Sequence, residues 1–366
     1  MKRYISLDVL RGLTVAMMIV VNNPGSWTNV YPMLKHTEWT GCTPCDLVFP
    51  FFLFCVGVSM AFAFVKYDGL SPDSLKKIFK RGILLYLTGF LLTAFPFYPV
   101  DRDPSLTFWQ NWVEWLSGLR IMGVLPRIAL CYVLGALLVL WLKSMKKISW
   151  AIGVLSVLHL SLLLLFAGPE GAFSLEGNFA RTLDLAILGE RHVYTGYGIP
   201  FDPEGLLGTL TGTCTVLLGY IIGMVVRGGK SPVETSAKVF ALSAAFLLAG
   251  VAMGIWIPIS KPLWTVSYVF YCAGWASFVF ALLMYLIDVK GWERPFFPFK
   301  ALGMNALTLF VLSGLLMKIN WIYIGWNYSA VFGGSAFMSL LFSLMYLLLH
   351  LVIAVVLYRK KIFIKL

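Results

Sequence analysis

The sequence predicts an all-α, polytopic bundle of about ten membrane-spanning helices. Of its 366 residues, 59% are hydrophobic and 13% are charged, and the mean hydropathy is +0.83. Soluble domains carry about 25% charged residues, so this chain has too little polar surface to cover itself in water. Its apolar residues gather into runs long enough to cross the roughly 30 Å of a bilayer core as helices. No polar block interrupts these runs, so residues 1–366 are expected to form one integral-membrane domain.

Ten apolar segments meet the length requirement. The first carries two charged residues, Asp8 and Arg11, and the ninth is short. No small-residue cleavage site follows the first run, so we expect that helix to be retained rather than removed as a signal peptide. The predicted spans are residues 5–23, 46–65, 79–97, 121–142, 148–167, 206–226, 237–257, 264–287, 301–318 and 336–358.

Basic residues gather at the termini and in every second connection between the spans. The two termini and the connections after spans two, four, six and eight hold 20 of the 29 Lys and Arg residues. Lys and Arg accumulate in cytoplasmic loops, so this pattern predicts that both termini are cytoplasmic. The net charge of +12 therefore marks one membrane face and does not indicate a nucleic-acid partner.

The remaining connections are expected to lie outside the cytoplasm. The longest of them, residues 168–205, is rich in Gly, Asp and Glu, and several others are rich in Trp and Tyr. Aromatic residues at this level are typical of the interfacial belt of membrane proteins, and they would also suit stacking on a sugar ring. The outer connections by this assignment are residues 23–45, 97–120, 168–205, 258–263 and 319–335.

Six cysteines are spread through mostly apolar stretches, and only Cys42 and Cys45 form a CxxC pair. Thioredoxin-like chemistry needs a βαβ context that is missing here, and a zinc site needs a second ligand pair. No metal site is therefore predicted. A structural role is favoured, with a disulfide between Cys42 and Cys45 as the alternative.

Polar residues inside apolar runs are costly, by about 2.5–3.5 kcal/mol for a charge at a helix centre, and usually face a cavity or a partner. Asp8 and Arg11 share a helix face, either as a snorkelling pair or with Arg11 free to bind a phosphate. Arg127 is deeper and suggests a polar cavity. Asn22 precedes Asn23 and a Pro-Gly stop, so it reads locally either as a helix cap or as a functional amide. Asn305 lies in a similar apolar context.

His36 is the histidine in the connection after the first span, close to the membrane boundary. Glu38 and Asp46 follow it and could each orient the imidazole as a catalytic base requires. A lone loop histidine is a weak signal, so the spacing alone leaves catalysis as one interpretation among several.

Several ordered motifs resemble the heparan-α-glucosaminide N-acetyltransferase family and its bacterial relatives. The stretch SLDVLRGLTVAMMIVVNNPG is followed by LKHTEWTGCTPCDLVFPFFLFCVGVS, and later by GVLPRIALCY, FDPEGLLGTLTG, SKPLWTVSYVF and GMNAL. They run from residue 6 to about 307 and are specific in combination.

This resemblance implies a membrane acetyltransferase that moves acetyl from cytosolic acetyl-CoA to an amino sugar across a bacterial inner membrane. The family's H-x-x-W-x-G motif falls on His36, Trp39 and Gly41, and its catalytic asparagine and acidic residue fall on Asn22 and Asp46. We accordingly predict His36, Asn22 and Asp46 as catalytic. The residues predicted to contact the cofactor are Arg11, Arg127 and Asn305, and those predicted to contact the acceptor are Trp39 and Glu38.

Two departures bear on the acceptor and the cofactor. Pro126 stands where the family usually has Gln before the arginine, so a side-chain amide is lost. The extra N-terminal lumenal portion of the animal enzyme is also missing, which weakens heparan itself as the acceptor. The predicted partners are acetyl-CoA, an amino-sugar or glycan acceptor, membrane lipid and a second copy of the chain in a homodimer.

Two chemical routes and two rival functions stay open at this point. Neutral His36 would either take the acetyl group as an acetylimidazole or deprotonate the acceptor amine during direct attack. Asn22 would donate to the oxyanion, an effect worth roughly 3–4 kcal/mol, and Asp46 would orient the ring. The rivals are a transporter or flippase for a glycan or lipid intermediate and a membrane O-acyltransferase.

Overall fold

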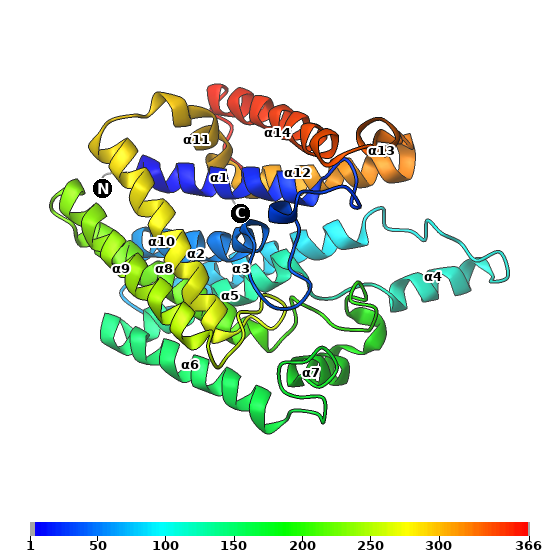
Figure 1. Cartoon of the computed structure of the whole chain (residues 1–366), viewed down its shortest axis with the longest axis horizontal. Helices are drawn as coiled ribbons and strands as arrows, with labels where there is room; N and C mark the ends of the chain where they lie inside the picture. The colour runs from blue at the N-terminus through cyan, green and yellow to red at the C-terminus, as the bar shows by residue number, and fades with distance from the viewer. Residues whose placement is uncertain (1–3, 365–366) are drawn as a thin grey trace.

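The computed structural model describes residues 4–364, which form a bundle of helices without strands (Figure 1). Most of the long helices lie roughly along the longest axis of the molecule, and α4 projects beyond the bundle at one end. The helices in chain order are α1 (Ile5–Asn22), α2 (Pro44–Ala63), α3 (Pro72–Ala94), α4 (Phe108–Ser117), α5 (Val124–Leu142), α6 (Met145–Leu165), α7 (Phe179–Leu188), α8 (Gly208–Gly228), α9 (Pro232–Met253), α10 (Val266–Leu283), α11 (Phe297–Met304), α12 (Ala306–Ile319), α13 (Tyr328–Phe332) and α14 (Ala336–Arg359).

Nine helices among residues 4–364 are long and apolar enough to cross a membrane, which confirms the predicted class of a polytopic helical membrane protein. These spans are Ile5–Asn22, Pro44–Lys66, Val124–Leu142, Met145–Leu165, Gly208–Gly228, Pro232–Met253, Val266–Val289, Ala306–Ile324 and Ala336–Arg359.

The remaining predicted span, residues 79–97, lies in α3. That helix has 23 residues, but its first half is basic and its apolar part begins only after Arg81. Ile83, Leu87 and Leu91 are exposed along one face of α3, and an apolar face of this kind suits contact with lipid.

The ninth predicted span, residues 301–318, was wrong as a continuous helix. The chain is helical on both sides of Asn305 but breaks there, between α11 and α12. The Asn305 side chain explains the break, because it donates to the carbonyl of Ile362 and accepts from the amide of Ile364 instead of continuing the helix. The span on this side of the break runs from Ala306 to Ile324.

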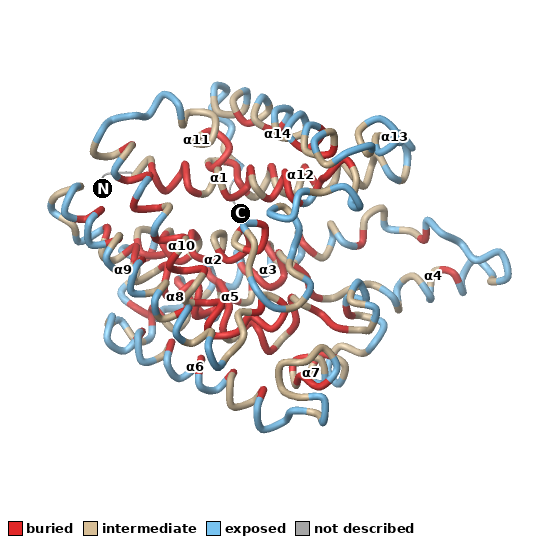
Figure 2. The backbone as a smooth tube through the Cα atoms, viewed as in Figure 1, coloured by how far each residue is buried: buried red, intermediate tan, exposed pale blue. Residues whose placement is uncertain are grey.

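An inner and an outer layer of helices can be told apart by burial (Figure 2). Most residues in the spans of α1, α2, α5 and α8 are buried, whereas at most 28% of the residues in the spans of α6, α9, α12 and α14 are buried. Exposed apolar side chains are costly in water and not in lipid, so this outer layer is the lipid-facing surface of the bundle.

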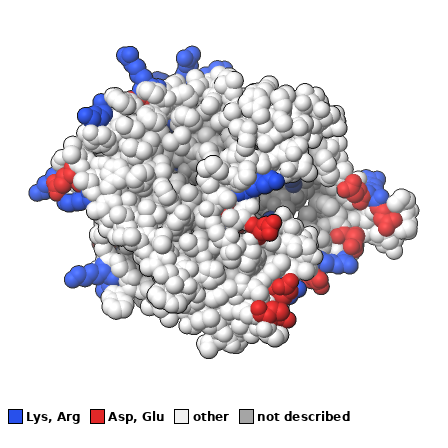
Figure 3. Space-filling view, viewed as in Figure 1, with Lys and Arg blue, Asp and Glu red and all other residues white. Residues whose placement is uncertain are grey.

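The two ends of the bundle differ in charge. In the view of Figure 3, most Lys and Arg lie at the left and upper edges, and most Asp and Glu lie toward the end that carries α4 and α7. Contacts between connections join those that the sequence predicts to lie on the same side of the membrane. Gly41 of one predicted outer connection donates to Ile259 of another, while Lys143 of a predicted inner connection pairs with Asp68.

Two glycines bring α1 and α11 into direct backbone contact. A Cβ added at Gly12 would lie 1.8 Å from the carbonyl oxygen of Phe299, and one added at Gly303 would lie 1.8 Å from the carbonyl oxygen of Asp8. Neither position can therefore accept a side chain without a shift of one helix.

We expect Gly12→Ala and Gly303→Ala each to destabilise the protein by about 1–3 kcal/mol, because overpacking forces the backbone apart. Thermal unfolding in detergent measures the effect. Gly153→Ala in α6 is the matched control, since nothing lies within 4 Å of its added Cβ. A Gly12→Ala variant as stable as Gly153→Ala would contradict the close contact.

Candidate functional site

His36 and Asp46 meet at the boundary between α2 and the first predicted outer connection, residues 23–45, which we call the first outer connection. The Nδ1 atom of His36 lies 2.7 Å from Oδ1 of Asp46. The Asp46 side chain is 1% exposed and that of His36 is 48% exposed. A buried carboxylate thus holds one edge of a partly exposed ring, and the catalytic roles of His36 and Asp46 stay predictions.

The second oxygen of Asp46 organises the loop and the start of α2. Oδ2 accepts hydrogen bonds from the amide and hydroxyl of Thr37 and from the amide and hydroxyl of Thr43, at 3.0–3.2 Å. Thr43 and Asp46 form a capping box, in which the side chain of the third helical residue bonds to the backbone of the N-cap residue just before the helix. The sequence T-P-C-D is a local signal for this cap, so one side chain both starts the helix and fixes the histidine.

The carboxylate also determines the tautomer of His36. An ionised carboxylate can only accept hydrogen bonds, so the Nδ1 atom that faces Asp46 must carry the hydrogen. Nε2 of the neutral ring then keeps its lone pair. This is the form in which an imidazole acts as a nucleophile or general base.

Gly41 completes the loop. Its φ of +99° is a left-handed conformation that glycine adopts at little cost, and its amide donates to the carbonyl of Ile259 at 2.7 Å. Ser260 donates to the carbonyl of Trp39 at 2.9 Å. The His36 loop is therefore fastened to the connection between α9 and α10.

That connection supplies a residue the sequence reasoning missed. Nζ of Lys261 lies 3.0 Å from Nδ1 and 3.3 Å from Nε2 of His36, and 3.5 Å from Oδ1 of Asp46. The signal for it was present, because Lys261 is a lone basic residue in a connection placed on the acidic or neutral side. Lys261 lies within the motif SKPLWTVSYVF.

Cys45 was also read as structural and lies against the same ring. Its sulfur is 3.2 Å from Nδ1 of His36, and both Cys45 and Cys42 are free thiols. The disulfide kept as an alternative is thus not formed in the structure.

A cavity of about 90 Å³ opens beside His36. It is smaller than the roughly 300–1,000 Å³ sites that enclose drug-sized ligands, so it suits a small reacting group. Its walls come from the ends of several helices and two connections. The lining residues are Met18, Val21, Asn22, His36, Cys45, Val48, Phe49, Val124, Glu204, Lys261 and Phe310.

Two adjacent asparagines at the end of α1 divide the roles that the sequence left open. Asn23 is buried and its amide donates to the carbonyl of Ile19 at 2.7 Å, so it is the residue that caps the helix. Asn22 is exposed and lines the cavity that also contains His36. The capping interpretation therefore belongs to Asn23, and the side chain of Asn22 is available to a ligand.

Arg127 is buried and its guanidinium is occupied by backbone. It donates to the carbonyl of Pro203 at 2.6 Å and that of Gly205 at 3.3 Å, and it lies over the ring of Trp264. Trp264 has a φ of +50°, a strained conformation for a residue other than glycine. Arg127 thus holds the loop that carries Glu204 to the cavity.

Arg120 fixes the same loop from the outer side. Its guanidinium makes two hydrogen bonds to Asp202, at 2.6 and 2.8 Å, and one to Glu204. These contacts raise the pKa of the Arg120 guanidinium against the effect of its burial. Glu204 therefore reaches the cavity as part of a closed ion-pair network.

The other predicted contact residues lie outside this cavity lining. Arg11 pairs with Asp8 on α1, and Asn305 binds the C-terminal segment. The indole of Trp39 donates to the carbonyl of Phe173 and packs edge-on against Phe201. Glu38 is exposed. Their roles in binding stay predictions.

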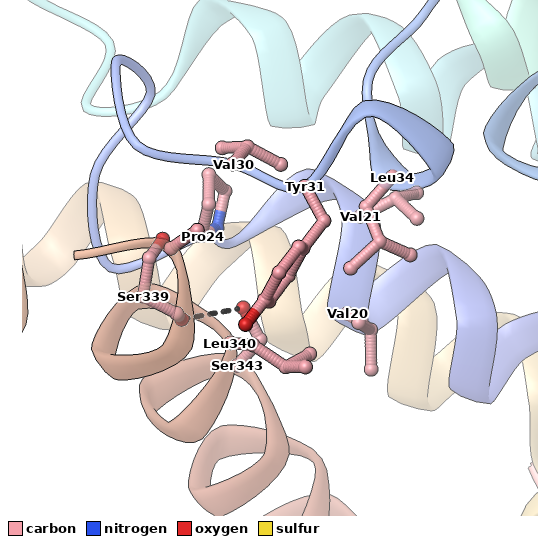
Figure 4. Close-up of a pocket in the computed structure, with 10 residues that line it drawn as sticks. Val20, Val21, Pro24, Val30, Tyr31, Leu34, Ser339, Leu340 and Ser343 are labelled. Carbon is pink, nitrogen blue, oxygen red and sulfur yellow. Dashed lines mark hydrogen bonds between the residues drawn. The ribbon is translucent and has the colours of Figure 1, made fainter.

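A second, smaller pocket lies where the first outer connection meets α14 (Figure 4). Tyr31 points between Pro24 and Val21 toward Ser343, and the free volume is about 10 Å³. That is barely enough for one water. Gly25 and Ser26 donate to Ser339, so this part of the loop is fastened to α14.

Asp184 on α7 is a buried carboxyl next to the same 202–205 loop. Oδ1 accepts from the amide of Leu206 at 2.8 Å, while Oδ2 has no hydrogen-bond partner within the described part of the chain. Burial, assisted by the nearby Asp202 carboxylate, raises the pKa of Asp184 to about 7 against the opposing effects of the Leu206 amide and Arg127.

The raised pKa of Asp184 makes the free energy of unfolding depend on pH in a definite direction. Because the folded pKa is above the ordinary value of 3.8, the neutral form stabilises the fold, and its contribution is lost as the pH rises toward and through about 7. We expect the apparent Tm to fall as the pH rises from 3.8 toward about 7 and to level off above that, and Asp184→Asn to flatten this slope. Asp101→Asn, on the exposed outer surface, is the control. An unchanged slope in Asp184→Asn would contradict the assignment.

Comparison with known proteins agrees with the motifs. A family model described as "Heparan-alpha-glucosaminide N-acetyltransferase, catalytic" matches residues 3–179. Proteins named heparan-alpha-glucosaminide N-acetyltransferase are 28% identical in Mus musculus, over 411 residues, and 29% identical in Homo sapiens, over 412. Each match covers 98% of this chain but only 60% and 59% of the relative. The resemblance to the heparan-alpha-glucosaminide N-acetyltransferase family is therefore confirmed, by its catalytic model over residues 3–179 and by both relatives along nearly the whole chain.

Proposed function

We propose that this protein is a membrane acetyltransferase. It takes acetyl from acetyl-CoA on the basic side of the membrane and delivers it to the amine of an amino sugar on the other side. The observation that carries the proposal is the half-exposed His36 ring, which a buried carboxylate holds by Nδ1 beside a small cavity, so that the neutral ring carries its lone pair on Nε2. The family resemblance supplies the reaction class, because the two relatives are named as N-acetyltransferases.

The first half-reaction would begin with attack of the neutral Nε2 atom on the thioester carbonyl. The carbon–sulfur bond breaks, CoA leaves as the thiolate, and the ring, whose Nδ1 keeps its hydrogen, holds the acetyl group as an acetylimidazolium. The neutral acceptor amine then attacks this carbonyl, the bond from the carbonyl carbon to Nε2 breaks, and the amine proton passes by way of the ring to the CoA thiolate. In the direct route, His36 instead removes the amine proton while the amine attacks acetyl-CoA itself.

Asn22 supplies the hydrogen-bond donor that either route needs. Its amide lines the cavity that contains His36, and Asn23 does the capping. A donor aimed at the position of the developing oxyanion stabilises the transition state more than the ground state. The same cavity presents Glu204, and the longest outer connection, residues 168–205, is acid-rich. These charges favour a cationic amine as the acceptor.

The basic end of the bundle would face the cytoplasm, where acetyl-CoA is made. Lys and Arg concentrate in the connections at that end, as the positive-inside rule requires of a protein in a bacterial inner membrane. Arg11 is half-buried on α1, between the cavity residue Met18 and the basic end. It is the predicted contact best placed for a CoA phosphate.

Labelled acetyl-CoA and a panel of amino sugars test the function in the purified full-length protein. We expect His36→Ala to reduce turnover by about 10²-fold or more, while CoA still raises the Tm. Lys35→Ala, an exposed neighbour in the same loop, should turn over normally. Label retained on wild-type protein would favour the acetylimidazole route. Absence of transfer to any amine would overturn the function, and normal turnover in His36→Ala would remove the histidine from it.

The asparagine pair gives a second, matched test. Asn22→Ala should lower kcat by about 10²–10³ with little change in KM or Tm, because it removes a contact made in the transition state. Asn23→Ala should do the opposite, lowering the Tm by loss of its bond to Ile19 and leaving kcat nearly intact. An equal kcat for Asn22→Ala and wild type would exclude Asn22 from catalysis.

A further inference from the structure

Lys261 occupies a defined position beside the His36 ring. Its ammonium is nearly equidistant from the two ring nitrogens, at 3.0 and 3.3 Å. At these distances the ammonium lies against the ring, within hydrogen-bond reach of Nε2 as well as beside Nδ1. The Lys261 side chain is 15% exposed and lines the same cavity as Asn22. A positive charge is therefore held next to the reactive ring.

The backbone around Lys261 is rigidly tied to the histidine loop. Its two preceding residues bind that loop, through the Ile259 carbonyl to Gly41 and the Ser260 hydroxyl to the Trp39 carbonyl. The Lys261 carbonyl accepts from the amide of Trp264, which is buried and holds a left-handed φ. A strained, buried anchor of this kind persists only when the surrounding structure imposes it, so the backbone position of Lys261 beside the His36 loop is built into the fold.

The charges around His36 would otherwise favour the wrong protonation state. Asp46 contacts the ring directly, and a nearby carboxylate favours the charged imidazolium. Glu204 faces the same cavity but is paired with Arg120, and Cys45 is a thiol. Lys35 and Glu38 flank His36 on the exposed surface and carry opposite charges. Among these groups, Lys261 is the cation that contacts the ring.

We propose that Lys261 is a positioning residue that keeps His36 neutral, by placing a positive charge against the ring and partly offsetting Asp46. The inference rests on the proposed function for its catalytic meaning. A cation within about 4–6 Å disfavours a second positive charge, so the ring retains the Nε2 lone pair that either acetyl-transfer route needs. Lys261 does not carry acetyl itself, because an acetylated lysine is an amide and no longer an activated acyl group.

The pH dependence of kcat/KM separates this role from a structural one. We expect Lys261→Met to move the acid limb of the profile upward by about one pH unit or more. Its activity is then lost at the acid end of the profile and recovers as the pH rises. Lys261→Arg should keep the wild-type profile because it keeps the charge. Lys35→Met is the control for loss of a lysine from this region. A uniform loss at every pH in Lys261→Met would overturn the proposal.

A second readout does not depend on turnover. Diethyl pyrocarbonate modifies the neutral imidazole, and His36 is exposed enough to react. The pH at which His36 becomes reactive, followed by mass spectrometry, should rise in Lys261→Met and stay unchanged in Lys261→Arg. An unchanged reactivity profile in Lys261→Met would overturn the proposal. If the profile moves but the wild type transfers no acetyl, the proposed function fails and the role of Lys261 stands.

Discussion

The arrangement of the site depends on one buried carboxylate. Asp46 accepts from two threonines with one oxygen and meets His36 with the other. The contacts with Thr43 are those expected of a helix that starts with T-P-C-D, because they form its capping box, whereas the contacts with Thr37 come from the preceding loop. The other carboxylate oxygen, Oδ1, remains available and contacts the His36 ring. The residue that starts α2 therefore also fixes the imidazole. Water competes poorly for this contact because the Asp46 side chain is 1% exposed.

The membrane explains why the other parts of the site are held as they are. Polar groups near a bilayer must find partners inside the protein, and here they find them in connections that fold onto one another. Arg127 illustrates the point: its guanidinium serves loop carbonyls that would otherwise be unpaired near Trp264. The rigid 202–205 loop is the result, and it brings Glu204 to the cavity wall.

Much of this could be predicted from the sequence, and the failures have specific physical causes. Apolar run length gave the helical class, and the short distance from His36 to Asp46 made their pairing plausible. Lys261 was missed because it is 225 residues from His36, and only the folded contact between two connections brings them together. The break at Asn305 was missed because its cause, a bond to residues 362 and 364, is equally remote in the chain. Asn22 and Asn23 could not be told apart locally, since either amide can close a helix.

The first outer connection is fastened at both ends to different parts of the bundle. Near Gly25 it is bound to α14, and near Gly41 it is bound to the segment before α10. The His36 imidazole lies between these two points of attachment. The loop that carries His36 is thus held to three separate elements, by α14, by the segment before α10 and by Asp46 at the start of α2. The place of the ring therefore does not depend on any single neighbouring helix.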